Sequence, residues 1–242
     1  MPKSPFPGFP KEAISFFRGL ARNNHRDWFQ PRKPVFDEQV KQPMIELCES
    51  INGALKRFAP HYVSDPAKAL YRIYRDTRFS KDKTPYKLHI AASFRHRFLG
   101  GDGTGAGFYF QVSHKDVSVG GGIYMPGPET LLAVRNHFAA HHKELETILK
   151  SRSLKRLLGD IQGDQLTRIP KGFACDHPAG DLLRRKQIYF FQELSPDLAT
   201  TPELHKEVVT RFEVMAPFIE FLNAPLTAKP RKPKIDAKDL LA

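Results

Sequence analysis

Apolar residues recur every three or four positions in the first and last parts of the chain. This spacing predicts amphipathic helices over residues 14–20, 36–55, 130–150 and 203–222. Each of these segments gathers its apolar residues on one face, which is typical of helices that pack against a shared core.

The middle of the chain changes to an alternation of apolar and polar residues. Leu88, Ile90, Ala92 and Phe94 alternate with more polar or smaller neighbours, as in a strand with one buried face. Strands are predicted at residues 70–75, 88–95, 108–112, 117–119 and 188–191. A tight turn at residues 114–116 should join two of them into a hairpin. We therefore predict an α+β fold in which an antiparallel sheet of about five strands is flanked by N-terminal and C-terminal helices.

The pattern indicates one domain followed by a tail. Residues 1–224 contain no internal repeat and no linker of the kind that separates domains, so they should form a single α+β domain. Residues 225–242 are basic and offer little to bury, which predicts a disordered tail. Cys48 and Cys175 lie far apart without metal-ligand spacing, and no apolar run is long enough for a bilayer. We expect a cytoplasmic protein with no membrane contact.

Positive charge is concentrated in one part of the chain. The formal net charge is +12, and residues 68–97 contain nine basic residues against two acidic ones. Residues 225–242 add a smaller basic excess. A clustered charge of this kind attracts anions such as phosphates, nucleic acid or acidic surfaces without choosing among them.

The segment 72–87, in and around the connection between the first two predicted strands, is the strongest candidate for chemistry. Guanidinium groups can fork onto phosphate oxygens, and ammonium groups add point charge. The predicted anion contacts are Arg75, Arg78, Lys81, Lys83 and Lys87. The alternative is that Arg75, Asp76, Arg78, Asp82 and Lys83 pair among themselves and pin a long loop to the sheet. The sequence leaves both interpretations open.

Several motifs stand in the order typical of one family. They are Phe9 and Phe17, residues 23–29 (NNHRDWF), residues 72–87, residues 120–126 (GGGIYMP), residues 170–173 (PKGF) and residues 176–178 (DHP). In these motifs the chain resembles the family called domain of unknown function 2461, over roughly residues 6–224. The resemblance implies a fold and a set of marked positions, and it implies no reaction.

Two of the marked segments could border a ligand. Asn24, Arg26 and Trp28 could form a pocket wall, although a helix-capping turn with Trp28 as a core anchor is the favoured interpretation. The run of glycines centred on Gly121 must admit either a ligand or another backbone segment, since glycine weakens a strand. Tyr124 would then stand at the rim as a stacking group or a hydroxyl donor.

Candidates for proton transfer and for metal binding are weak. Asp76, Asp176 and His177 are the available catalytic groups, because a carboxylate near an imidazole adjusts its proton affinity. Adjacent residues rarely face each other, so a turn held by Asp176 is favoured over an acid–base pair. His137 and His141 have i, i+4 spacing but no third ligand, and we expect neither a metal nor a cofactor.

Three functions remain open at this stage. The leading hypothesis is binding of an anionic, phosphate-bearing ligand through the basic strand-loop-strand segment. Nucleic acid is one such ligand, with Tyr71, Tyr74 and Tyr86 as stacking groups. The alternatives are an enzyme acting on a phosphorylated small molecule, and a structural or adaptor protein whose ion network only stabilises the fold.

Overall fold

A computed structural model describes residues 6–100 and 104–227 of the chain. The helices are α1 (Lys11–Arg22), α2 (Arg26–Phe29), α3 (Lys33–Val35), α4 (Gln42–Phe58), α5 (Pro66–Ala69), α6 (Pro128–Leu149), α7 (Arg152–Leu158), α8 (Gly180–Leu183) and α9 (Glu203–Thr227). Shorter segments are the 3-10 helices η1 (Gln30–Arg32), η3 (Pro60–Tyr62) and η4 (Pro196–Thr200), and the π-helix η2 (Phe36–Lys41). The strands are β1 (His89–Arg95), β2 (Gly107–Ser113), β3 (Val117–Ile123) and β4 (Ile188–Leu194).

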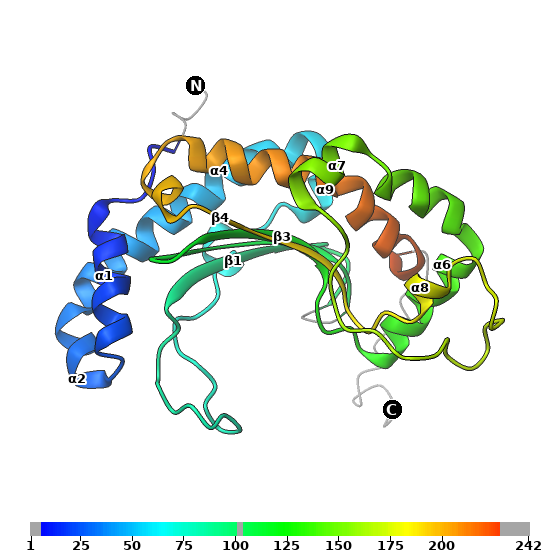
Figure 1. Ribbon diagram of the computed structural model, residues 1–242. Helices are drawn as coiled ribbons and strands as arrows, with labels where there is room; N and C mark the ends of the chain where they lie inside the picture. The colour runs from blue at the N-terminus through cyan, green and yellow to red at the C-terminus, as the bar shows by residue number, and fades with distance from the viewer. Residues whose placement is uncertain (1–5, 101–103, 228–242) are drawn as a thin grey trace, which may run out of the picture.

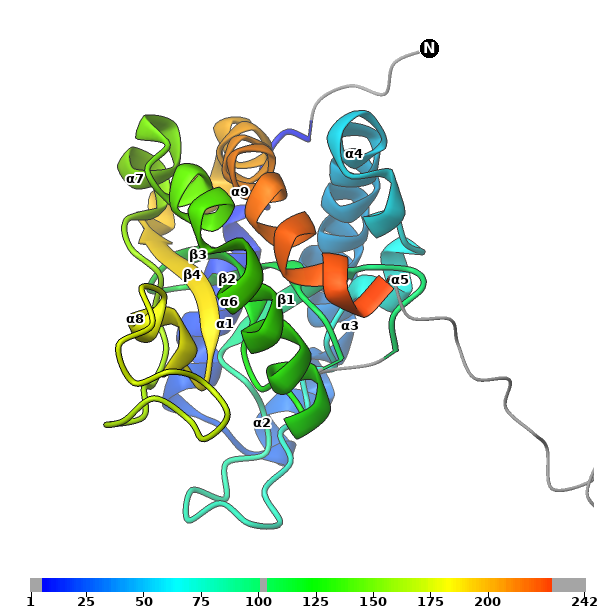
Figure 2. The ribbon, with the colours of Figure 1, turned by 90° about the vertical axis from the view of Figure 1, so that its right-hand side faces the viewer.

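The strands form one antiparallel sheet in the order β1-β2-β3-β4. The sheet is arched, and α4, α7 and α9 lie over its convex face (Figure 1). Viewed from the side, α9 runs between α4 and α6 (Figure 2). Helices α1 and α2 lie beside one end of the arch (Figure 1). The concave face is the side of the sheet away from these covering helices.

Aromatic packing joins the convex face to α9. The ring of Phe212 lies 6.0 Å from that of Phe94 and 4.9 Å from that of Phe108, measured between centroids. Phe190 of β4 meets Phe218 edge-on at 4.9 Å. All of these side chains are buried. The alternating apolar residues of the strands therefore supply one side of the core, and the apolar stripe of α9 supplies the other.

The register of the sheet defines the residues of the concave face. Ser93 pairs with Tyr109, Tyr109 with Gly120, and Gly120 with Phe191, so these four form one row across the strands. Neighbouring rows of the same face are Arg95, Gly107, Gly122 and Tyr189, and Ala91, Gln111, Ser118 and Glu193. Side chains two residues apart on a strand share a face, so every residue of these rows belongs to the concave side.

The predicted fold class is confirmed, and the sheet is an open one of four strands. Residues 70–75 differ from the expectation of a further strand, because they make only isolated bridges, Leu70 with Ala92 and Tyr74 with Tyr86. The hairpin around residues 114–116 is confirmed by the pairing of β2 with β3. The predicted tail starts inside α9, which continues to Thr227, and the remainder of it lies outside the described residues. Among the described residues, no helix has the length and apolarity to span a lipid bilayer.

Candidate functional site

Residues 70–75 and 85–87 form two backbone-paired arms at the edge of β1. The Tyr71 amide donates to the carbonyl of Ala91 at 2.9 Å, and the Lys87 amide donates to the carbonyl of Ile73 at 2.8 Å. Residues 76–84 connect the arms, and we call them the projecting loop because they extend away from the sheet on its concave side (Figure 1). The arms hold the inner end of the basic segment against the sheet, and the loop carries its outer end into solvent.

Three cations of the basic segment, Arg75, Arg78 and Lys83, form bonds with residues of the projecting loop. The Arg75 guanidinium donates to the Asp82 carboxylate and to both oxygens of Thr84. Arg78 forks onto Asp76 with N–O distances of 2.8 and 3.0 Å, and the Lys83 ammonium donates to the carbonyl of Thr77 at 2.9 Å. This is the internal pairing that the sequence left as an alternative.

The loop carboxylates respond to these bonds. Hydrogen bonds from Arg78 lower the pKa of Asp76 to about 2. The amide of Thr84, with Arg75 next, lowers the pKa of Asp82 to about 2. Both carboxylates are therefore charged at neutral pH. Lys81 is exposed and forms no ion pair with another residue of the described ranges.

Asn24 clamps the second arm instead of capping a helix. Its side-chain amide donates to the carbonyl of Tyr86 at 2.9 Å, and its side-chain oxygen accepts from the Tyr86 amide at 3.1 Å. The N-cap position of α2 is held by His25, which makes no side-chain capping bond, so the predicted capping role of Asn24 is wrong. Trp28 packs against the core beside Phe16, as an anchor should, and Arg26 is exposed.

The surroundings of the β3 glycines show whether a ligand or another backbone segment approaches that strand. A Cβ on Gly120 would lie 2.5 Å from the carbonyl oxygen of Phe190, and one on Gly122 would overlap the carbonyl oxygen of Ile188. Gly122 also has a φ of +131°, a conformation that L side chains rarely adopt. A neighbouring backbone therefore approaches these two positions. Gly121 faces the core, where a Cβ would collide with Met215.

A cavity of about 620 Å³ lies on the concave face of the sheet. Glycines at positions 107, 120 and 122 leave its floor bare, and the side chains around it are largely aromatic. The residues that carry its chemistry are Tyr71, Arg95, Tyr109, Tyr124, Tyr189 and Phe191. Glycine relieves crowding between adjacent backbones and so permits a sheet to bend. The glycines thus account both for the arch and for the hollow beneath it.

Positive charge stands at the β1 side of this cavity. Arg95 donates from Nη2 to the hydroxyl of Tyr71 at 3.0 Å, and its guanidinium carbon lies 5.6 Å from the centre of the Tyr71 ring. The Lys87 ammonium lies 5.3 Å from the same ring centre. Burial lowers the pKa of Lys87, and the charge of Arg72 lowers it further. Burial and then Lys87 also lower the pKa of His89, against a weaker opposing effect of Asp116.

A polar network positions Tyr109 on the cavity wall. Its hydroxyl donates to Gln111 at 2.8 Å, and the Gln111 amide donates to Asp116 and to Ser118 at 3.3 Å each. Ser118 in turn donates to Asp116 at 2.9 Å. Burial raises the pKa of Tyr109, so its hydroxyl stays protonated at neutral pH. The network fixes the ring at the centre of the concave face.

The predicted site residues are therefore divided among several places. Of those residues, Gly121 and Tyr124 line the cavity, and Lys87 stands beside it on the ring of Tyr71. Tyr124 is 62% exposed and meets Tyr189 edge-on at 5.3 Å, as expected for a residue at the rim. Of the predicted stacking groups, Tyr71 lines the cavity, Tyr74 is 45% exposed, and Tyr86 is buried in a stack with Phe29.

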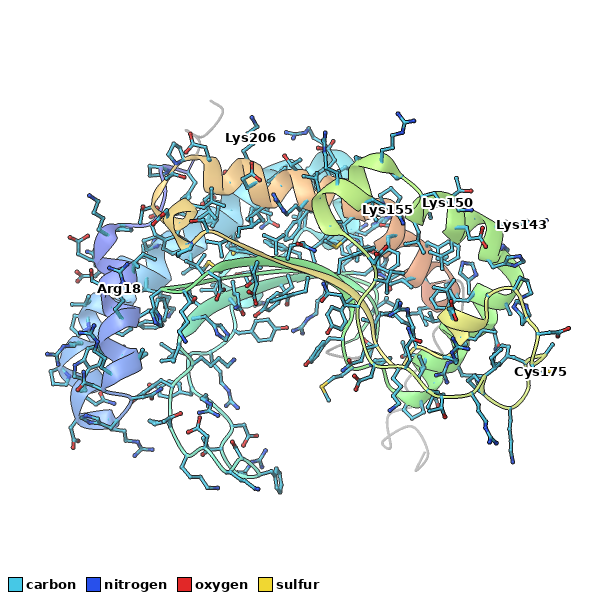
Figure 3. The ribbon with its side chains drawn as sticks, in the orientation of Figure 1. Arg18, Lys143, Lys150, Lys155, Cys175 and Lys206 are labelled. Carbon is cyan, nitrogen blue, oxygen red and sulfur yellow. The ribbon has the colours of Figure 1, made fainter. Side chains whose placement is uncertain are left out.

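The candidates for catalysis do not meet at the cavity. Asp76 belongs to the projecting loop, and neither Asp176 nor His177 lines the cavity as the described residues outline it. The chain around Pro178 is held by His177, whose Nδ1 accepts from the amide of Ala179 at 3.0 Å. This differs from the expected role of Asp176, which is exposed. Cys175, next to it, lies on the far side of the arch from the projecting loop (Figure 3).

The described residues contain no group of three side chains suited to a metal ion. His137 and His141 do come together on α6, with their ring centroids 4.5 Å apart.

Four residues of the cavity were not predicted as site residues from the sequence: Arg95, Tyr109, Tyr189 and Phe191. Their signal was the alternation of the strands next to a run of glycines, which placed them on one face without showing that it is hollow.

Comparison with known proteins places the chain in a protein family. Residues 12–221 match the family described as "Conserved hypothetical protein (DUF2461)". The chain belongs to the DUF2461 family. The resemblance inferred from the motifs is thereby confirmed. Neither the curated proteins nor the solved structures that were compared gave a match.

Proposed function

We propose that this DUF2461 protein binds an anionic, phosphate-bearing ligand of nucleotide size in the concave cavity. The observation that carries the proposal is the pair of cations, Arg95 and Lys87, that lie 5.6 and 5.3 Å from the centre of the Tyr71 ring, at the edge of an aromatic hollow. The ligand class is the one that the basic segment suggested. The proposed binding position differs, because it lies at the inner end of the basic segment, beside Lys87, and not on the projecting loop.

Electrostatics at the cavity edge favour an anion. Burial and the neighbouring charge of Arg72 both disfavour the charged form of Lys87 and lower its pKa. A phosphate at this edge would counter both effects, and hydrogen bonds between ions are stronger than those between neutral groups. Arg75 and Arg78, toward the outer end of the basic segment, have carboxylates of their own, so they have less to gain from the same anion.

The size and the walls of the cavity suit a planar ring. Cavities of about 300–1,000 Å³ are typical for small-molecule ligands, and this one holds about 620 Å³. A ring lying over the bare glycine floor would meet Tyr109, Tyr189 and Phe191 from the sides. Aromatic rings attract one another in offset or edge-on arrangements. A nucleotide combines such a ring with the phosphate that the cations favour, and a nucleic acid could present the same group.

The enzymatic alternative has less support. Asp76, Asp176 and His177 would have to reach a ligand in the cavity, and none of them lines it. Tyr109, a titratable group at the centre of the concave face, is protonated at neutral pH as tyrosines ordinarily are, and burial raises its pKa further. We therefore favour binding over catalysis. A reducing, cytoplasmic location is part of the proposal, in keeping with the free thiols of Cys48 and Cys175.

Isothermal titration calorimetry with AMP, GMP, CMP and UMP tests the proposal. At least one nucleotide should bind, and Arg95→Gln should weaken it about tenfold or more, because a hydrogen bond to a charged group contributes about 1.5–3 kcal/mol. The matched control is Lys206→Gln, which makes the same charge change on the helix-covered side of the sheet (Figure 3). The absence of binding by all four nucleotides, or an equal loss in both variants, would contradict it.

A further inference from the structure

The projecting loop exposes an aromatic side chain that the cavity does not use. Phe79 is 95% exposed, more than any other large apolar residue exposed in the described ranges. Burying a phenylalanine side chain is worth about 1.5–3 kcal/mol relative to leaving it in water. A ring held in solvent on a loop is therefore a site where a partner would gain contact.

Bonds within the loop hold Phe79 in its exposed position. The bonds of Arg75 to Asp82 and Thr84 close the base of the loop. Arg78, next to Phe79, is fixed by its fork onto Asp76. Because the loop is already ordered, a partner would lose less affinity to the ordering of the chain on binding. The internal pairing that removes these cations from an anion pocket thus serves to present the ring.

The charge around Phe79 identifies the kind of partner. The Arg78 guanidinium carbon lies 5.7 Å from the centre of the Phe79 ring, and Lys81 and Lys83 follow on the same loop. Arg78 and Lys83 are bonded within the loop, but Lys81 is exposed and has no ion pair with another described residue. An unpaired cation on the same loop as an exposed ring matches a ligand that alternates phosphates with flat bases. Stacking of a base on an aromatic side chain is worth about 1–3 kcal/mol and tolerates any sequence.

The arms of the basic segment connect this loop to the cavity. Arg72, on the first arm, acts electrostatically on both Lys87 at the cavity and Asp76 in the loop. Residues 71–76 would span about 16 Å as an extended chain, at about 3.3 Å per residue. Phe79 does not line the cavity, so a single nucleotide bound there would not cover its ring, whereas a strand of several nucleotides is long enough to contact both.

We infer that the projecting loop is a second contact for single-stranded nucleic acid, with Phe79 stacking on a base outside the cavity. The inference rests on the proposed function, since it extends the phosphate-bearing ligand from one nucleotide to a strand. An anionic membrane is the less favoured partner. A single apolar anchor gives only marginal membrane binding, whereas one aromatic ring is enough to stack on a base.

Two probes separate this inference from the proposed function. Fluorescence polarisation with a fluorescein-labelled oligothymidylate of about 12 nucleotides reports the strand, and calorimetry with AMP and UMP reports the cavity. Phe79→Ala should weaken oligonucleotide binding about tenfold and leave mononucleotide binding unchanged. Phe79→Trp should retain the affinity because it keeps a stacking ring. Since Phe79 is 95% exposed, neither change should lower the unfolding temperature.

Each outcome has a defined meaning. Oligonucleotide binding that is equal in the wild type and Phe79→Ala would overturn the inference and leave the cavity proposal standing. Failure of mononucleotides and oligonucleotide alike would overturn both. If the wild type bound phosphatidylserine vesicles and Phe79→Ala did not, and neither bound the oligonucleotide, the loop would be a membrane contact and the inference would be overturned.

Discussion

The clamp between Asn24 and Tyr86 gives a prediction about stability. Asn24→Ala removes the donor to the carbonyl of Tyr86 at 2.9 Å and the acceptor from the amide of Tyr86 at 3.1 Å. Tyr86 is 1% exposed, so water has little access to replace the lost partners. A buried polar group left without its partner costs about 1–3 kcal/mol. We therefore expect the free energy of unfolding to fall by roughly 3 kcal/mol, or the melting temperature by roughly 6–12 °C.

Urea unfolding followed by circular dichroism measures this change. The matched control is Asn136→Ala, because Asn136 is exposed on α6 and alanine favours a helix. The control should change stability by less than about 0.5 kcal/mol. A loss below about 1 kcal/mol for Asn24→Ala would refute the reasoning, because it would mean that the arms of the basic segment are held without the clamp.

Three further predictions concern charge. Burial and Arg72 lower the pKa of Lys87 in the free protein, so AMP binding should take up protons above pH 8, where the phosphate is already dianionic. Affinity should then fall as pH rises, the calorimetric enthalpy should depend on the buffer, and Lys87→Gln should abolish both effects. Burial also lowers the pKa of His89 and His205 from 6.5 in the folded state, so the unfolded chain binds more protons. Stability should therefore decline as pH falls from about 7 to 5, and a constant urea midpoint over this range would count against that assignment. Arg78→Ala should leave the melting temperature unchanged, since the Arg78 side chain is 77% exposed. A large decrease would favour the structural role of the loop.

Local periodicity predicted the elements of the fold well. The alternation on both sides of residues 114–116 placed β2 and β3, and the apolar stripe of residues 203–222 placed most of α9. Residues 70–75 have the composition of a strand, but they form only isolated bridges, Leu70 with Ala92 of β1 and Tyr74 with Tyr86 of the other arm. That difference depends on tertiary contacts such as the clamp by Asn24, which lies 62 residues from Tyr86.

The candidate site was harder to predict because its residues look ordinary in sequence. Tyr109 and Phe191 alternate with core residues as any outward-facing strand residues do, and a period of two does not say which face is covered. The run of glycines was the useful signal, yet its meaning depended on the approach of β4 to Gly120 and Gly122. Whether Arg75 and Arg78 were paired depended on the loop conformation, which local composition does not fix.

Amide chemical shifts provide the most direct test of the claim that the ligand binds on the concave face. Glycine amides occupy a distinctive region of the nitrogen–proton correlation spectrum, so Gly107, Gly120 and Gly122 can be followed during a titration with the nucleotide that binds most tightly. The account predicts that these three resonances shift together, with a saturation curve that Arg95→Gln moves to higher concentration. Shifts confined to residues 76–84, with the floor glycines unmoved, would contradict it.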